Sequence, residues 1–142
     1  MDRIEDCISF LLGKAAHQVS RRAREKLARW GVTPTQYAVL KTLWEQNGQT
    51  GAAIGARLAI DSATITGLID RLAAAGLLER RESPEDRRIN LLYLTPRGRA
   101  LQVPLDAAMD ALNAEVAAEL RRAGPTVRRA LGRLGEDPGQ HE

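Results

Sequence analysis

The chain has 142 residues, of which 44% are hydrophobic, so it is long enough for one domain with an apolar core. Aromatic residues make up only 4%, and the core must therefore be mainly aliphatic. The net charge of +3 is too small to establish a nucleic-acid partner, so the placement of the charges has to decide that question. With Cys7 as its single cysteine, the chain can form no intrachain disulfide, which favours an intracellular location.

The N-terminal sequence lacks the charged-then-apolar order of a signal peptide. No apolar run in the chain approaches the length that crosses a bilayer. We therefore expect a soluble, cytoplasmic protein that has no membrane partner.

Residues 3–29 are predicted to form one helix, because the segment holds no proline and a single glycine, Gly13. Its apolar residues cover more of the circumference than the roughly 100° stripe that a surface helix buries. Such a helix needs a second apolar partner, which is either the rest of a monomer or a second copy of the chain. We interpret residues 1–30 as an N-terminal dimerisation helix. The apolar stripe consists of Ile4, Ile8, Leu11, Ala15 and Val19, flanked by Cys7, Phe10, Leu12 and Ala16.

Two helices and a turn are predicted next, at the start of a winged helix-turn-helix domain over residues 31–98. Thr33 is a suitable N-cap for the first helix, and Pro34 suits its first helical position. Thr50 is a suitable N-cap for a short second helix. Residues 59–61 then form the turn.

The third helix, predicted over residues 61–75 with Asp61 as its N-cap, has two different faces when its residues are placed about 100° apart. Large aliphatic residues gather on one face, which must be the core. The opposite face carries small residues in place of the Lys and Glu of an ordinary solvated face, so it can approach another surface closely. Together with the free N–H groups that a helix N-terminus offers to phosphate, this pattern predicts a recognition helix for the DNA major groove. The core face is Ile65, Leu68, Ile69 and Leu72, and the opposite face is Ala63, Thr66, Gly67, Asp70 and Ala74, with Thr64 and Arg71 on its flank.

Two strands are predicted at residues 77–82 and 89–94. Between them, Ser83 and Pro84 fit a type I turn over residues 83–86. A charged loop is usually only a solvated turn, but directly after a helix-turn-helix it is better interpreted as a wing that contacts phosphates or the minor groove. The arginines around this loop are Arg80, Arg81, Arg87 and Arg88.

A long helix capped by Thr95 is expected to kink or break near Val103, because Pro104 lies inside it. A short final helix follows. We interpret residues 99–134 as C-terminal dimerisation helices, and we expect residues 135–142 to be a disordered tail.

The combined motifs resemble the MarR family of winged helix-turn-helix transcription regulators. The resemblance rests on the helix start at residues 31–40, the recognition-helix string at 61–80 and the segment 84–101. The last segment includes the wing pattern Asp86-x-Arg88. The resemblance implies a mainly α fold with a small wing of two or three β-strands and with flanking dimerisation helices.

The resemblance further implies a homodimer that binds double-stranded DNA, usually as a repressor that a small ligand releases. The recognition helix, residues 61–75, would enter the major groove of a pseudo-palindromic operator, and the wing, residues 80–90, would enter the minor groove. Arg88 matches the wing arginine of the family, and Asp86 matches the acid that orients it. The residues expected to contact DNA are Ser62, Ala63, Thr64, Thr66, Gly67, Arg71, Asp86, Arg87 and Arg88.

The alternative function is a winged-helix adaptor that binds another protein and has lost DNA binding. The small residues on the exposed helix face and the arginines of the wing argue against it. An enzyme is disfavoured, because the chain holds no HExxH or CxxC motif, no Gly-rich phosphate loop and no Ser-His-Asp set. One cysteine and one histidine outside the tail cannot fill a structural metal site, so no metal and no cofactor is expected.

An effector site is a hypothesis that rests on five residues, of which three lie in the N-terminal helix and two in the helix that begins after Thr33. If they converge, they form an aromatic floor with cationic and hydrogen-bonding groups, suited to a small aromatic or phenolic effector with a carboxylate. The equally weighted alternative is that the aromatic residues belong to the core and the arginine is solvated. The five residues are His17, Ser20, Arg21, Tyr37 and Trp44.

One branch of the MarR family senses organic hydroperoxides through a cysteine directly before a phenylalanine in the first helix. Phe10 matches that phenylalanine, but Ser9 precedes it and Cys7 lies two positions away from the sensing position. We therefore do not expect this chemistry, and we interpret Cys7 as a small apolar residue in the helix interface.

Overall fold

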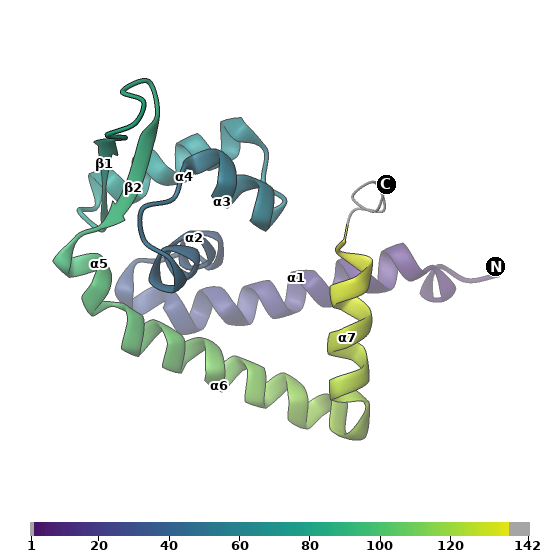
Figure 1. The fold of residues 1–142 in the computed structure, drawn as a ribbon. Coiled ribbons are helices and arrows are strands. Elements are labelled where there is room, and N and C mark those ends of the chain that lie inside the picture. The colour runs from purple at the N-terminus through teal and green to yellow at the C-terminus, as the bar shows by residue number, and fades with distance from the viewer. Residues whose placement is uncertain (1, 137–142) are drawn as a thin grey trace.

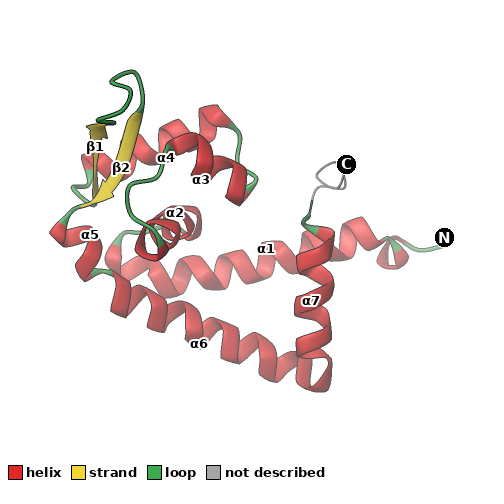
Figure 2. Cartoon of the chain, viewed as in Figure 1, coloured by secondary structure: helices red, strands yellow, loops and turns green. Residues whose placement is uncertain are grey.

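The computed structural model describes residues 2–136, which form seven α-helices, three short 3-10 turns and one antiparallel hairpin (Figures 1 and 2). In chain order the α-helices and strands are α1 (Ile8–Leu27), α2 (Pro34–Glu45), α3 (Gly51–Leu58), α4 (Ser62–Ala74), β1 (Leu78–Glu82), β2 (Asn90–Leu94), α5 (Pro96–Ala100), α6 (Gln102–Leu120) and α7 (Gly124–Leu134). The 3-10 turns are Ile4–Asp6, Ala28–Trp30 and Arg121–Ala123. We call α2, α3, α4 and the β1–β2 hairpin the head, and α1, α6 and α7 the arm.

The head stands on one end of the arm (Figure 1). In the arm, α1 and α6 lie side by side, and α7 turns away from the far end of α6. Helix α2 lies at the base of the head, where it contacts α1 and α6 as well as α3 and α4. The hairpin, α3 and α4 lie on the side of α2 that faces away from α6 (Figure 1). The head therefore presents its helix-turn-helix and its wing away from the arm.

Helix starts follow the capping residues that the sequence predicts. The hydroxyl oxygens of Thr33, Thr50 and Thr95 each accept a backbone N–H from the third residue of the helix that follows, at 3.2, 3.1 and 3.1 Å. The carboxylate of Asp61 accepts the N–H of Thr64 at 2.8 Å. These four predictions are confirmed, and each cap satisfies a donor that a helix end leaves without a partner.

The hydrophobic core lies in the head and at its junction with the arm. All four residues predicted for the core face of α4 are buried, which confirms that prediction. In α1, by contrast, only Ala23 and Leu27 at the C-terminal end are buried, and in α6 only Leu105 and Leu112. The most deeply buried side chains are Leu27, Val39, Leu40, Leu43, Ile54, Leu72 and Leu105.

The N-terminal helix begins at Ile8, so the predicted start at residue 3 is wrong. Ile4–Asp6 form a separate 3-10 turn. Cys7 is extended, with φ −79° and ψ 114°, and precedes the helix as its N-cap. Ile4 is 55% exposed, so no buried apolar contact within the chain offsets the cost of extending the helix over this turn.

The hydrogen-bonded turn of the wing lies at Asp86–Ile89, three residues later than the predicted type I turn. The N–H of Ile89 donates to the carbonyl of Asp86 at 3.0 Å. The side chain of Asp86 also accepts the N–H of Arg88 at 3.0 Å, and this side-chain bond favours a turn that starts at the aspartate. The strands flanking the loop are each one residue shorter than predicted, and Gln49 adds a short bridge to Leu92 of β2.

The break in the C-terminal helix lies at Leu101, between α5 and α6, two residues before the predicted position. Pro104 is the third residue of α6, where a helix does not need the N–H that proline lacks. The final short helix is present and begins at Gly124. Most of the predicted tail, residues 137–142, lies outside the described residues.

Within residues 2–136, no single helix is long and apolar enough to cross a membrane. The pair α3 and α4 reaches the required length and composition only when joined across a bend of 117°.

Candidate nucleic-acid interface

The face of α4 that points away from the core is exposed and built from small residues. Ser62, Ala63, Thr64 and Thr66 are exposed, and Gly67 is half-buried. The Thr66 hydroxyl donates to the Ser62 carbonyl at 2.8 Å, and the Thr64 hydroxyl donates to Asp61 at 2.7 Å. Both hydroxyl protons are thus engaged within the helix, which leaves a low, uncharged ridge that can approach a groove closely.

The N-terminus of α4 offers fewer free donors than the sequence suggests. The backbone N–H of Thr64 is taken by Asp61, and this bond holds the pKa of Asp61 below its ordinary value. The capping carboxylate therefore stays charged at neutral pH. A phosphate at this end of the helix would meet the remaining N–H groups beside a negative charge, which weakens this helix end as an anion site.

Two of the four wing arginines brace the hairpin instead of projecting from it. Arg80 of β1 forms an ion pair with Asp70 of α4. The guanidinium of Arg81 pairs with Glu79 and lies over the ring of Tyr93, 4.3 Å from the ring centroid. The sequence placed all four arginines around the wing tip, but only the last two lie at the tip.

At the wing tip, Asp86 holds the guanidinium of Arg88 in a two-point contact. Nε and Nη2 of Arg88 lie 3.1 and 3.0 Å from the two carboxylate oxygens of Asp86. The Arg88 side chain contributes most to keeping the pKa of Asp86 below its ordinary value. The Arg88 side chain is nevertheless 89% exposed, and Arg87 beside it is exposed as well. The pair thus presents an oriented cation to a partner.

The two elements that carry these surfaces lie on the same side of the molecule. Helix α4 contacts β1, and the Arg80–Asp70 pair joins their exposed faces. The hairpin tip and α4 both lie on the side of the head that faces away from the arm (Figure 1). A small-residue helix face beside a cationic loop has the shape and charge that DNA binding needs, with the helix for base edges and the loop for the backbone or minor groove.

A family model described as MarR family matches residues 32–89, which hold α2, α3, α4 and most of the wing. The HTH-type transcriptional regulator TtmR of Methylorubrum extorquens is 38% identical over 104 residues, covering 72% of this chain and 53% of TtmR. The organic hydroperoxide resistance transcriptional regulator of Bacillus subtilis is 32% identical over 100 residues, covering 70% of this chain and 68% of that protein. The chain belongs to the MarR family. It spans about half the length of TtmR.

Solved structures of similar proteins share the fold of this MarR-family chain along most of its length. A probable transcriptional regulator from Pseudomonas aeruginosa matches with a TM-score of 0.86 at 35% identity, covering 93% of this chain and 99% of that one. BpsR of Bordetella bronchiseptica, a protein whose DNA binding is regulated by 6-hydroxynicotinic acid, matches with a TM-score of 0.87 at 27% identity. The match covers 96% of this chain and 99% of BpsR. Reduced AbfR bound to DNA matches with a TM-score of 0.71 at 28% identity. The match covers 91% of this chain and 94% of AbfR.

The five residues of the effector hypothesis fall into two groups in this MarR-family fold. Tyr37 and Trp44 lie edge to face with ring centroids 5.9 Å apart. Their polar atoms point to the C-terminal half of the chain, because the Tyr37 hydroxyl donates to Asp106 at 2.8 Å and the Trp44 ring N–H donates to the Gly98 carbonyl at 3.0 Å. Arg21 pairs with Glu25 of its own helix at 3.9 Å. The other two residues, His17 and Ser20, are exposed on α1.

Cys7 is half-buried and lies at the start of α1 instead of inside it. The backbone N–H of Phe10 contributes most to lowering the pKa of its thiol from the ordinary value. Its place before the helix was not predicted. Within the part of the chain that the structure describes, no three His, Cys, Asp or Glu side chains lie close enough together to hold a metal ion.

Two carboxylates that form structural contacts with other elements escaped the sequence analysis, one in the head and one in the arm. Asp70 was placed on the exposed face of α4 without a partner, and its contact with Arg80 could have been suspected only from a correct alignment of β1 against α4. Asp106 accepts hydrogen bonds from Tyr37 and Lys41 at 2.8 Å each. These partners lie 69 and 65 residues away, so no local pattern signals the contact.

Proposed function

We propose that the chain is a sequence-specific transcription regulator that binds double-stranded DNA as a homodimer, in the cytoplasm and without catalysing a reaction. Helix α4 enters the major groove, and the wing, residues 80–90, reaches the minor groove. The observation that carries this proposal is that two elements lie on one side of the head: α4, with its exposed small residues, and the hairpin tip, which holds the oriented Arg88. The relatives named as transcription regulators and the DNA-bound structure of AbfR support it.

The second copy in this proposal covers the apolar surface of the arm. Ile8 and Leu11 of α1 are 67% and 43% exposed, and Leu131 and Leu134 of α7 are 49% and 70% exposed. Several large aliphatic side chains on two helices exceed the scattered exposure that is normal for a monomer. Burying them between two copies is the simplest way to remove them from water.

A groove of about 610 Å³ between α6 and α7 provides a place for the partner's N-terminal segment. Its walls are mainly aliphatic, and Arg128 and Arg129 lie along it. The N-terminal segment carries the complementary character, with the exposed Ile4 next to Glu5 and Asp6. The flanking helices, residues 1–30 and 99–134, thus form the dimer, and residues 31–98 form the DNA-binding part.

The regulator is further proposed to be a repressor that a small aromatic or phenolic effector releases from a pseudo-palindromic operator. The regulation of BpsR by 6-hydroxynicotinic acid supports this class of effector. The candidate contacts remain His17, Ser20 and Arg21 of α1 with Tyr37 and Trp44 of α2. A thermal-shift screen of aromatic acids tests this part, and no rise in melting temperature with any of them would contradict it.

In vitro selection from a random duplex library, followed by fluorescence anisotropy, tests DNA binding directly. We expect the selected sequence to contain two inverted half-sites whose centres lie about 10 bp apart or a multiple of that. Arg88→Ala should weaken binding and lower the slope of log affinity against log salt by about 0.9 for each lost phosphate contact. Arg24→Ala removes another exposed arginine, from α1, and should leave both quantities unchanged.

An unenriched library would favour the alternative function, a winged-helix adaptor that binds protein. If the library is enriched but Arg88→Ala binds the selected duplex as tightly as the wild type, the wing tip does not contact DNA, and α4 remains the proposed contact.

Analytical ultracentrifugation tests the dimer. Leu131→Asp places a charge in the α6–α7 groove and should give monomers. Ile89→Asp places the same charge at a 42% exposed position in the wing, outside the flanking helices, and should remain dimeric. If both variants remain dimeric, the dimer interface lies outside the α6–α7 groove.

A further inference from the structure

One stripe of α2 donates three hydrogen bonds to the α5–α6 segment. Tyr37, Lys41 and Trp44 follow one another at helical spacing, so their side chains leave the same side of α2. The Tyr37 hydroxyl and the Lys41 ammonium each lie 2.8 Å from one carboxylate oxygen of Asp106. The Trp44 ring N–H donates to the Gly98 carbonyl at 3.0 Å. The three contacts span the break at Leu101, with Gly98 before it and Asp106 after it.

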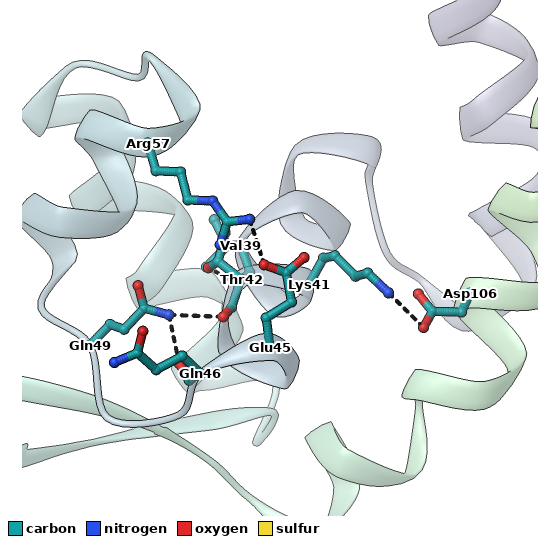
Figure 3. Close-up of polar contacts among 8 residues, drawn as sticks. All are labelled: Val39, Lys41, Thr42, Glu45, Gln46, Gln49, Arg57 and Asp106. Atoms are coloured by element: carbon teal, nitrogen blue, oxygen red, sulfur yellow. Dashed lines mark hydrogen bonds and ion pairs between the residues drawn. The ribbon is translucent and has the colours of Figure 1, made fainter. Parts of the chain in front are cut away.

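The same helix is tied to the helix-turn-helix on its other side. Figure 3 shows Lys41 extending toward Asp106 of α6, while Glu45 and Arg57 meet away from it. The Glu45 carboxylate pairs with the Arg57 guanidinium of α3 at 2.5 Å. The Gln49 side chain donates to the carbonyls of Thr42 and Gln46, at 2.8 and 2.6 Å, and so fixes the chain between α2 and α3. Helix α2 therefore connects the arm to the DNA-facing helices through polar contacts on both sides.

The Asp106 contact is directional as well as attractive. Its side chain is 24% exposed. Burial alone raises the pKa of Asp106, but the bonds from Lys41 and Tyr37 outweigh it and hold the pKa below the ordinary value. The carboxylate is therefore charged at neutral pH and uses one oxygen for each donor. Two bonds to one planar group restrict rotation of α6 against α2 more than a single contact does.

From this geometry we propose that Asp106 is a positioning residue for DNA binding. It fixes the angle at which the head leaves the arm, and that angle sets the distance between the two α4 helices of the dimer. The distance in turn selects the half-site spacing of the operator, because each recognition helix must meet its own major groove. This inference rests on the proposed function.

The test measures affinity across a series of duplexes that keep the two selected half-sites but change their separation by one or two base pairs. The wild type should prefer one spacing by about tenfold or more. Asp106→Asn keeps the size of the side chain and loses its charge, so the preference should fall to about threefold or less, or the optimum should move. Asp110→Ala removes an exposed carboxylate one turn further along α6 and should keep the wild-type profile.

A variant at the donor side gives a second, independent measurement. Lys41→Met should relax the spacing profile as Asp106→Asn does, and the double variant should relax it no further, because both changes remove the same ion pair. Circular dichroism establishes which variants fold. If one of the single variants fails to fold, the other carries the same expectation.

An Asp106→Asn or Lys41→Met protein that loses affinity equally at every spacing would overturn the inference and leave Asp106 with a purely structural role. That outcome leaves the proposed function intact, since the wild type still binds its selected duplex. A wild type that binds no duplex would instead refute the proposed function, and the inference with it.

Discussion

Arg80 of strand β1 forms an ion pair with Asp70 of α4, so the two elements proposed to face DNA are joined by their own side chains. Asp70 is 61% exposed and Arg80 37% exposed, and a pair this open to water adds little to folding stability. Its main effect is electrostatic. Asp70 is the one carboxylate in the proposed contact face of α4, and Arg80 compensates its charge.

Removing the charge of Asp70 should therefore strengthen non-specific DNA binding. In Asp70→Asn, Arg80 loses its partner, and the surface proposed to contact DNA gains one net positive charge. We expect the affinity for random duplex to rise several-fold and the salt slope to steepen by about one. Anisotropy titrations at several salt concentrations measure both. Weaker binding to random duplex would instead mean that Asp70 contributes to DNA binding by positioning Arg80.

Gly67 gives a test of how closely α4 approaches its partner. A Cβ at this position would meet only the side chain of Arg71, at 3.7 Å, so the free protein accommodates Gly67→Ala. Alanine is favoured over glycine in a helix interior by about 1 kcal/mol, and the melting temperature should rise slightly. If the helix lies against DNA, the added methyl group should lower operator affinity at the same time. Unchanged affinity would place Gly67 outside the interface.

Gly98 requires glycine for a different reason. A Cβ there would overlap the carbonyl oxygen of Leu77 and lie 3.2 Å from a methyl group of Leu94. The Gly98 carbonyl also accepts the Trp44 ring N–H. Gly98→Ala should cost about 2–3 kcal/mol of unfolding free energy through overpacking. Urea denaturation measures this loss, and Gly67→Ala serves as the matched control. A cost below about 0.5 kcal/mol would show that the backbone near Leu77 yields easily.

The contribution of Asp106 to stability should depend on pH in a defined direction. Its pKa in the folded protein is lowered, so the stabilisation is fully present above the unfolded-state value of about 3.9 and is lost as the pH falls through the folded value. At pH 7, Asp106→Asn should be less stable than the wild type by about 2 kcal/mol.

This difference should shrink below about pH 4, where the wild-type carboxylate becomes protonated. Urea unfolding at fixed protein concentration, from pH 3 to 8, measures it. Asp110→Asn should show no comparable difference at pH 7. A gap between wild type and Asp106→Asn that widens in acid would contradict the ion-pair account.

The helix starts and the two faces of α4 could be predicted because they depend on residues close together in the chain. Thr33, Thr50, Asp61 and Thr95 each cap a helix with a side chain that reaches only three residues ahead. The periodicity of α4 likewise separates core from surface within a few turns. Local rules of this kind need no knowledge of the rest of the fold.

The errors lie where the outcome depends on competing or distant partners. The wing turn moved because the Asp86 side chain bonds to the backbone of Arg88, which a turn propensity for Ser and Pro does not weigh. The start of α1 moved because its apolar stripe finds no burial within one chain. Which wing arginines lie at the tip and which hold the hairpin depends on Asp70 and Tyr93. The Asp106 contacts join residues 65 or more positions apart in the chain.

The near-absence of buried residues in α1 has a consequence for how the protein is made. Only Ala23 and Leu27 of this helix are buried within one chain, and α1 leaves the ribosome before α7. In the proposed dimer, α1 of a nascent chain is therefore covered only when it meets a second chain whose α7 is already complete. We expect a finished subunit to pair with a chain that is still being translated from the same mRNA. Subunits encoded by two gene copies should then form mixed dimers only after existing dimers dissociate.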